Sequence, residues 1–190
     1  MTEDTPTADP AWEPPLAGSD AEHLTGTLER LSATFRWKAD GLTVDQLRAR
    51  PIPSTALTVG GLLKHLAVCE DDVFQWRISG RAPVTWTLAP EGDAERWQFS
   101  VEPDEGAADV YALWSAAVDR SRDRLRELMA GGGLDQPGHL EFEGSVPSVR
   151  RHLHDLIEEY GRHTGHLDLL REAIDGRVGE DPPADWPMLP

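Results

Sequence analysis

Apolar residues recur every three or four positions in four stretches of the chain, which is the spacing of helices that bury one face. The last stretch is the clearest, because its apolar positions from Val149 to Ile174 alternate between spacings of four and three without a break. Ser19, followed three residues later by Glu22, forms a capping-box motif before the first stretch. We therefore predict long helices at about residues 20–39, 58–79, 107–130 and 149–175, with a short helical turn at 43–48.

Four amphipathic helices of this length predict an all-α fold in which the apolar faces meet in a four-helix bundle. The bundle is expected to occupy residues 18–176. Residues 1–17 precede the first capping motif and are interpreted as a disordered leader. Residues 177–190 follow Gly176, a helix-terminating glycine, and form a tail rich in proline and acidic residues.

Two long connections join the predicted helices, one between the second and third and one between the third and fourth. The first, residues 81–106, contains Trp86, Trp97 and Phe99 together with several prolines. A connection of this length is typically functional, or is a lid packed by its own aromatic side chains. Both interpretations remain open from the sequence. The second, residues 134–146, includes a short stretch that resembles an extended segment.

The charge of the chain narrows the class of partner. The 190 residues include 34 acidic and 18 basic side chains, for a net charge of −16. Such a chain has no electrostatic basis for binding nucleic acid or an anionic membrane, whereas it favours cations. Cys69 is the single cysteine, which excludes an intrachain disulfide and fits a reducing cytoplasm. The segment 1–15 lacks the pattern of a signal peptide, and no apolar run is long enough to span a membrane.

The fourth predicted helix carries a group of candidate metal ligands. Glu159, His163 and His166 are separated by spacings of four and three, which return to one narrow sector of a helix. This sector borders the apolar face, where an unpartnered carboxylate or imidazole is costly to bury. A divalent cation would satisfy all three groups, and helical bundles build carboxylate and histidine metal sites with this spacing.

The second predicted helix offers a matching histidine. His65 lies beside the apolar positions Leu62, Leu66 and Cys69, again at the border of the buried face. One histidine from this helix and a Glu/His group from the fourth would supply three protein ligands, which leaves a position open as in catalytic sites. Imidazole combined with carboxylate suits Zn²⁺, Ni²⁺ or Fe²⁺ better than Ca²⁺.

A simpler interpretation is that these histidines are hydrogen-bonded residues at the edge of the core. The sequence alone leaves the two interpretations open. Glu158 and Arg162 are interpreted as an exposed ion pair, and Cys69 as an inert buried thiol rather than a ligand or nucleophile. The remaining histidines show no pattern and are expected at the surface: His23, His139, His152 and His154.

Two motifs resemble a known superfamily when they are taken together. The segment from Leu57 to Ala67, which contains Gly60, Gly61 and His65, and the distant segment from His154 to Glu172 resemble the DinB-like superfamily. Within it, they are most similar to an actinobacterial branch related to mycothiol-dependent maleylpyruvate isomerase. The resemblance covers about residues 20–176. It implies a bundle of up-down-down-up topology that binds zinc or nickel through a histidine on helix two and a pair four residues apart on helix four.

The ligands that the resemblance implies can be placed in this chain. His65 matches the histidine of helix two and His163 matches the last ligand of helix four. The remaining position, usually histidine, is occupied by Glu159, as in the maleylpyruvate isomerase branch. His166 lies one turn further on and could replace or supplement Glu159, although the resemblance favours Glu159.

The resemblance also implies a function. Related proteins are metal-dependent S-transferases or isomerases that use a low-molecular-weight thiol such as mycothiol, so a small-molecule substrate is expected here. A metal-dependent hydrolase with the same site is one alternative, and a non-catalytic, stress-related binding bundle is another. Relatives often form dimers through their helix faces, which makes a homodimer an expectation as well.

Overall fold

The structure, a computed structural model, describes residues 10–186. Within this range the chain is helical and forms no strand beyond two isolated bridges in the connection before the last helix, which confirms the predicted all-α class. The helices in chain order are α1 (Asp20–Ala39), α2 (Val44–Arg48), α3 (Val59–Asp71), the π-helix η1 (Asp72–Arg77), α4 (Val84–Leu88), α5 (Ala94–Trp97), α6 (Ala107–Gly131), the 3₁₀ helix η2 (Gly133–Asp135) and α7 (Val149–Asp175).

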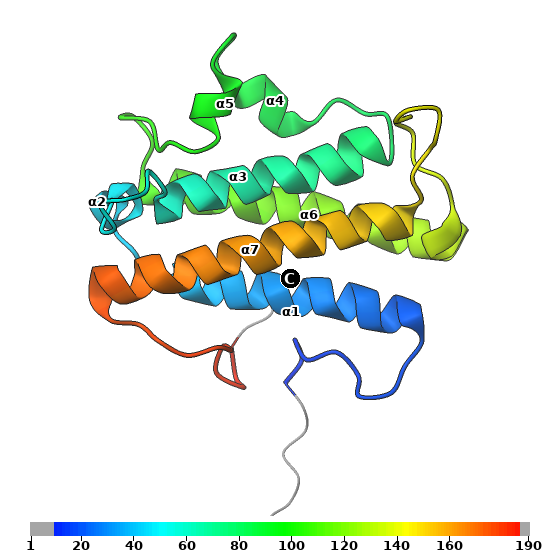
Figure 1. The fold of residues 1–190 in the computed structure, drawn as a ribbon, viewed down its shortest axis with the longest axis horizontal. Helices are drawn as coiled ribbons and strands as arrows, with labels where there is room; N and C mark the ends of the chain where they lie inside the picture. The colour runs from blue at the N-terminus through cyan, green and yellow to red at the C-terminus, as the bar shows by residue number, and fades with distance from the viewer. Residues whose placement is uncertain (1–9, 187–190) are drawn as a thin grey trace, which may run out of the picture.

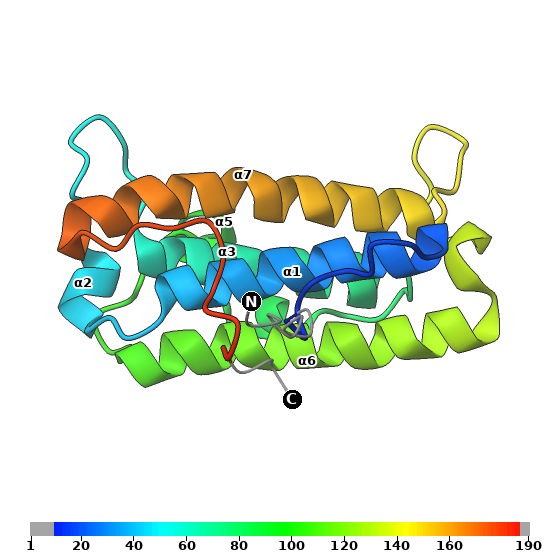
Figure 2. The same cartoon turned by 90° about the horizontal axis from the view of Figure 1, so that it is seen from below.

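The four long helices α1, α3, α6 and α7 lie side by side and enclose one hydrophobic core (Figures 1 and 2). The most extensive contacts join α1 to α7 and α3 to α6, and α3 also packs on α7. At the centre, the ring of Phe35 lies 6.0 Å from that of Trp114 and 5.9 Å from that of Tyr160. The indole N–H of Trp114 donates to the Tyr160 hydroxyl at 3.2 Å, so the polar edges of these rings are paired within the core.

The ends of the long helices follow the sequence signals. The Ser19 hydroxyl accepts from the Glu22 N–H at 3.2 Å, and the Glu22 carboxylate accepts from the Ser19 N–H at 2.7 Å, which is the predicted capping box. Gly176 ends α7 with a φ of 80°, in the left-handed region that glycine tolerates without steric cost. These local signals confirm the predicted ends of α1 and α7.

The predicted second helix extends over α3 and η1, but its last part is a π-helix that the sequence pattern did not indicate. Asp71, at the end of α3, is fully buried and accepts a hydrogen bond from the Thr85 N–H at 3.0 Å. Its carboxylate also forms an ion pair with Arg120 of α6 at 2.9 Å. This single carboxylate therefore connects both α4 and α6 to the end of α3.

The connection 81–106 was expected to be a loop, but it contains the short helices α4 and α5, which lie over the outer side of α3 (Figure 1). Trp97 is buried there, and the Lys64 ammonium sits 4.0 Å from the centre of its ring. Trp86, in contrast, remains about half exposed. Helices of this length are stabilised by tertiary contacts rather than by their own periodicity, which is why the apolar pattern did not predict them.

Both segments that flank the bundle lie against α1 where the structure describes them. Trp12 is buried, and the Arg30 guanidinium lies 5.7 Å from the centre of its ring. Arg30 also pairs with Glu13 at 3.0 Å and with Asp181 at 2.9 Å. Residues 1–9 of the predicted leader and 187–190 of the predicted tail lie outside the described residues. Among the described residues, no helix has the length and apolar character needed to cross a membrane.

Candidate metal centre

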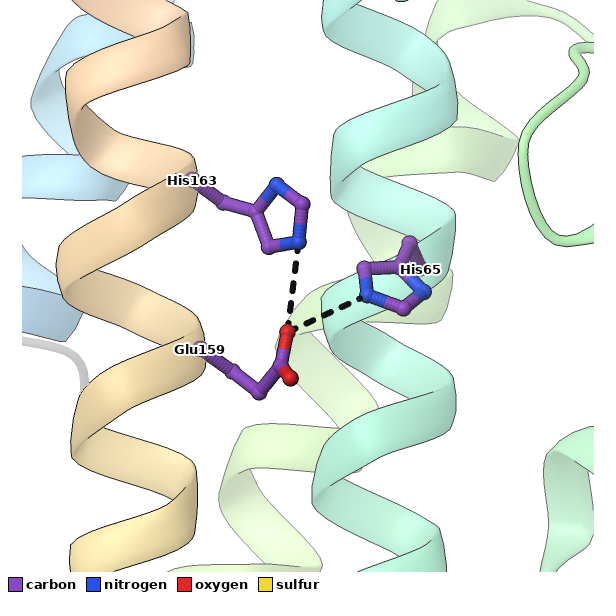
Figure 3. A group of neighbouring side chains, drawn as sticks. All are labelled: His65, Glu159 and His163. Atoms are coloured by element: carbon purple, nitrogen blue, oxygen red, sulfur yellow. Dashed lines mark ion pairs between the residues drawn. The ribbon is translucent and has the colours of Figure 1, made fainter.

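Three of the predicted ligands meet between α3 and α7. Figure 3 shows His65 projecting from α3 toward Glu159 and His163 of α7. Each residue offers one ligand atom, and these atoms all lie within 4.8 Å of one another. The Glu159 Oε2 is central, 3.5 Å from the His65 Nε2 and 3.2 Å from the His163 Nε2. The arrangement is the convergence that the spacing on two separate helices predicted.

The local sequence explains why these side chains face one another. On α7, Leu156, Tyr160 and Leu167 are fully buried, and they fix which side of the helix meets the core. Glu159 and His163, four residues apart, lie at the edge of that side, where α7 approaches α3. Side-chain exposure is 15% for His65, 40% for Glu159 and 9% for His163, so the group lies below the surface but is open to solvent on the carboxylate side.

Burial and the neighbouring His65 lower the pKa of His163 to about 4, although the Glu159 carboxylate opposes the shift. His163 is therefore neutral at pH 7, which is the form of imidazole that binds metal ions. Its Nε2 is the nitrogen nearest to Glu159, and its Nδ1 lies 3.3 Å from the Nδ1 of His166. His166 thus contacts the ring nitrogen of His163 that is not the one nearest to Glu159. It lies outside the group of three converging candidate ligand atoms.

His65 is held by two residues of the connection 81–106. Its Nδ1 lies 3.0 Å from the Gln98 Oε1, and its ring stacks on Phe99 with 4.5 Å between the ring centres. Both partners follow α5, in the connection 81–106. No local motif indicates this contact, because it depends on how the connection folds back over α3.

The donor set fits a divalent cation. The Gln98 Oε1 can only accept a hydrogen bond, so its 3.0 Å contact with the His65 Nδ1 favours the neutral tautomer that has its proton on Nδ1 and a lone pair on Nε2. That lone pair faces the Glu159 carboxylate, which is also an electron-pair donor, at 3.5 Å. In this tautomer both groups are electron-pair donors, and a cation between them would stabilise the arrangement. Two imidazoles and one carboxylate are also a ligand set that Zn²⁺ binds in catalytic sites.

The other chemically interesting side chains fall outside this group. Cys69 lies one turn beyond His65, its Sγ 3.5 Å from the His65 Nε2, and burial raises the pKa of its thiol far above the ordinary range. This agrees with the expectation of an inert thiol. Glu158 and Arg162 form the expected exposed ion pair at 2.8 Å. His23, His139 and His154 are exposed as expected.

His152 is a correction, because it was expected at the surface and is 1% exposed. Neither of its ring nitrogens has a hydrogen-bond partner among the described residues, and burial lowers its pKa. Its position explains the burial. It lies three residues after Val149 and four before Leu156, on the buried face of α7 that these two residues define.

A model of the mycothiol S-transferase family matches residues 23–176, a range that runs from α1 to the end of α7 and includes all three converging residues. The chain belongs to this family. The match confirms the resemblance to the DinB-like superfamily and to mycothiol enzymes that the two motifs indicated. Membership in the mycothiol S-transferase family indicates a transferase related to mycothiol and a small-molecule substrate. No curated protein matches the chain.

Proposed function

We propose that this protein is a metal-dependent S-transferase that joins a low-molecular-weight thiol, mycothiol in the first instance, to a small electrophilic molecule. The observation that carries the proposal is the convergence of two imidazole nitrogens and one carboxylate oxygen within 4.8 Å. Membership in the mycothiol S-transferase family supports mycothiol as the thiol and a transferase as the class of enzyme. In the reaction, the thiol sulfur forms a bond to an electrophilic carbon, the leaving group departs with the bonding electrons, and the thiol proton passes to solvent.

The arrangement of the long helices supports the same assignment. We propose that α1, α3, α6 and α7 form the up-down-down-up bundle of DinB-like proteins. The colour gradient in Figure 1 runs from right to left along α1 and α7, and from left to right along α3 and α6. This order brings α3 and α7 into contact as antiparallel neighbours. A ligand from the first half of the chain can then meet ligands from its last helix.

His65, Glu159 and His163 would hold one divalent ion, for which Zn²⁺ or Ni²⁺ suits the combination of imidazole and carboxylate. Such an ion lowers the pKa of a bound thiol, so that the nucleophilic thiolate is present at neutral pH. The chain itself contributes charge and orientation. Glu159 would neutralise part of the charge of the ion, and the burial of His163 keeps this imidazole neutral at pH 7.

We propose that Glu159, rather than His166, is the third ligand. His166 would instead orient His163 through the contact between their Nδ1 atoms at 3.3 Å. If the His163 Nδ1 donates its proton to the His166 Nδ1, the His163 Nε2 carries a lone pair that faces Glu159, which lies 3.2 Å away. Partners of this kind on the far nitrogen are common for metal-binding histidines and fix the ring orientation.

Metal analysis of protein purified without an affinity tag tests the proposal. We expect close to one Zn²⁺ or Ni²⁺ per chain. His65→Ala and His163→Ala should each lose most of the metal while the helical circular dichroism is retained. His154→Ala is the control, because His154 is an exposed histidine on the same helix as His163. Full metal content in both site variants would refute the assignment of ligands.

A turnover assay separates the transferase from the alternative of metal-assisted hydrolysis. Small electrophiles are presented to the metal-loaded protein with and without mycothiol, and the products are identified by mass spectrometry. A transferase gives a thioether adduct that depends on the thiol. Equal turnover without the thiol would instead favour water as the nucleophile.

A further inference from the structure

Residues 98–101 lie directly on the first turns of α3, and two consecutive glycines allow this close approach. Gly60 and Gly61 are both buried at the start of α3. A Cβ atom at Gly61 would lie less than 3.0 Å from the carbonyl oxygen of Phe99, and a Cβ at Gly60 would lie less than 3.0 Å from a methyl group of Val101. Any larger residue would therefore push the segment 98–101 away from α3.

The segment carries two side chains that enclose the ring of His65. The Gln98 Oε1 lies 3.0 Å from the His65 Nδ1 and can accept a hydrogen bond from it. The Phe99 ring stacks on the imidazole with an angle of 23° between the ring planes. The contact with Gln98 can fix the proton on Nδ1, and the contact with Phe99 fixes the plane of the imidazole ring. Together they determine where the His65 Nε2 points.

The position of the proton matters because two acceptors compete for it. If the proton sits on Nδ1, it pairs with Gln98 and leaves the Nε2 lone pair facing the site. If it sits on Nε2, it points toward the Glu159 carboxylate, which lies 3.5 Å away. Only the first tautomer can bind a metal ion through Nε2. The shorter distance to Gln98 favours this tautomer.

The segment is also anchored from outside the site. The Gln98 N–H donates to the Ala94 carbonyl at 3.1 Å, as a continuation of α5. Trp97, the preceding residue, is buried under the ammonium of Lys64, which in turn pairs with Glu105 at 2.8 Å. Lys64 is the residue before His65, so the contact between Lys64 and Trp97 fixes α5 to the turn of α3 that carries His65.

We propose that Gln98 is a positioning residue that holds His65 in the metal-binding tautomer. Gly60 and Gly61 leave the space that allows residues 98–101 to pack on α3, so that Gln98 reaches His65. The inference deepens the proposed function and rests on it in one respect, namely that His65 binds the metal. It assigns a role to the connection 81–106, whose length is typical of a functional segment or a lid.

The first test measures Co²⁺ affinity by competition with a coloured chelator, using the full chain. Gln98→Leu, which has no acceptor, should weaken Co²⁺ binding by about 10-fold to 100-fold. Gln98→Glu keeps an acceptor for the Nδ1 proton and should restore the affinity. Ser100→Ala is the matched control in the same segment, because the Ser100 hydroxyl donates to the Arg96 carbonyl and not to His65. It should leave the affinity unchanged.

The second test needs no metal. Long-range proton–nitrogen NMR spectra distinguish a protonated ring nitrogen from a bare one. In the metal-free wild type, we expect the His65 proton on Nδ1. In Gln98→Leu, we expect a shift toward the Nε2 tautomer, because Glu159 is then the remaining acceptor near the ring. A purely structural role for Gln98 would not move this equilibrium.

The third test examines the space that Gly60 and Gly61 leave for residues 98–101. Gly61→Ala should lose Co²⁺ affinity to an extent similar to Gln98→Leu, since the added methyl group displaces the Phe99 carbonyl. Gly161→Ala on α7 is the control, because a Cβ at Gly161 meets no atom within 4 Å. If Gly61→Ala does not fold, the Gln98 variants still decide the proposal.

The outcomes separate this inference from the proposed function. If the wild type binds no Co²⁺, the proposed function fails, and the tautomer measurement on the metal-free protein still decides the role of Gln98. If the wild type binds Co²⁺, and Gln98→Leu binds it equally well with its His65 proton unchanged, the positioning role is overturned.

Discussion

Glu70 is a buried carboxyl group whose pKa is strongly raised, and this shift has a direct consequence for the stability of the fold. It is 2% exposed on α3, and its Oε1 accepts a hydrogen bond from the Tyr160 hydroxyl at 2.8 Å. Its second oxygen, Oε2, has no hydrogen-bond partner among the described residues. Burial raises its pKa from 4.5 to about 7, against the opposing hydrogen bond from Tyr160. We predict that Glu70→Gln stabilises the protein at neutral and alkaline pH.

The magnitude follows from the two pKa values. Below 4.5, Glu70 is protonated in both the folded and the unfolded chain, so it adds no dependence on pH. Between 4.5 and about 7, the folded chain keeps a proton that the unfolded chain has lost, and the free energy of unfolding falls as the pH rises. At about 1.4 kcal/mol per pKa unit, this interval costs about 3 kcal/mol. Above pH 7, the loss is complete.

Glutamine removes this dependence, because its amide stays neutral at every pH. Its oxygen can still accept from Tyr160, and its nitrogen can donate to the Ser121 hydroxyl, which lacks a partner among the described residues. The variant should match the wild type near pH 4.5 and exceed its stability by up to about 3 kcal/mol near pH 8.

Urea unfolding from about pH 5 to about pH 8 measures the effect, with a chelator present so that bound metal does not add to the stability of the folded state. Glu158→Gln is the control, because it removes the same charge from an exposed carboxylate on α7. We expect it to shift the free energy of unfolding by less than about 0.5 kcal/mol. If the wild type and Glu70→Gln gave parallel stability curves across this range, the assigned burial of a titrating carboxyl would be wrong.

Three further predictions address the site, the core and the thiol. Glu159→Gln should weaken Co²⁺ binding much more than His166→Gln, and the opposite order would make His166 the third ligand. Leu167 is fully buried, so Leu167→Ala should cost about 2–5 kcal/mol in urea unfolding of the metal-free protein, against about 0.5 kcal/mol or less for Glu158→Ala. Because burial raises the pKa of Cys69, a thiol reagent should label the folded protein slowly at neutral pH and the urea-unfolded chain quickly. Equal labelling rates would contradict the raised pKa of this partly buried thiol.

The long helices could be predicted because the signals that define them are local. The apolar alternation of α7, the capping box at Ser19 and the left-handed glycine at Gly176 each act within a few residues of one another. The meeting of His65 with α7 was predicted from the faces that the two helices bury. The same reasoning was available for His152, which shares the buried face of α7, but no pattern was recognised there and a surface position was expected.

The contacts made by the connection 81–106 could not be predicted in this way. Trp97 is buried because a lysine of α3 lies over its ring, and Gln98 reaches His65 because two glycines of α3 leave space for the chain. Each contact joins residues more than 30 positions apart, so no spacing within either segment encodes it. The glycines were visible in the sequence, but what fills the space above them follows only from the packed structure.

The spacing of the candidate site is fixed by the core beneath it. On α7, Glu159 faces the site while the next residue, Tyr160, points into the core and donates to Glu70 of α3. This buried hydrogen bond joins the same two helices that carry the candidate ligands, so it helps to hold α3 and α7 at a defined separation. The three candidate ligand side chains therefore do not have to draw the helices together themselves. The core supplies this geometry in advance, which is how a preorganised site keeps electron-pair donors close enough to bind a cation.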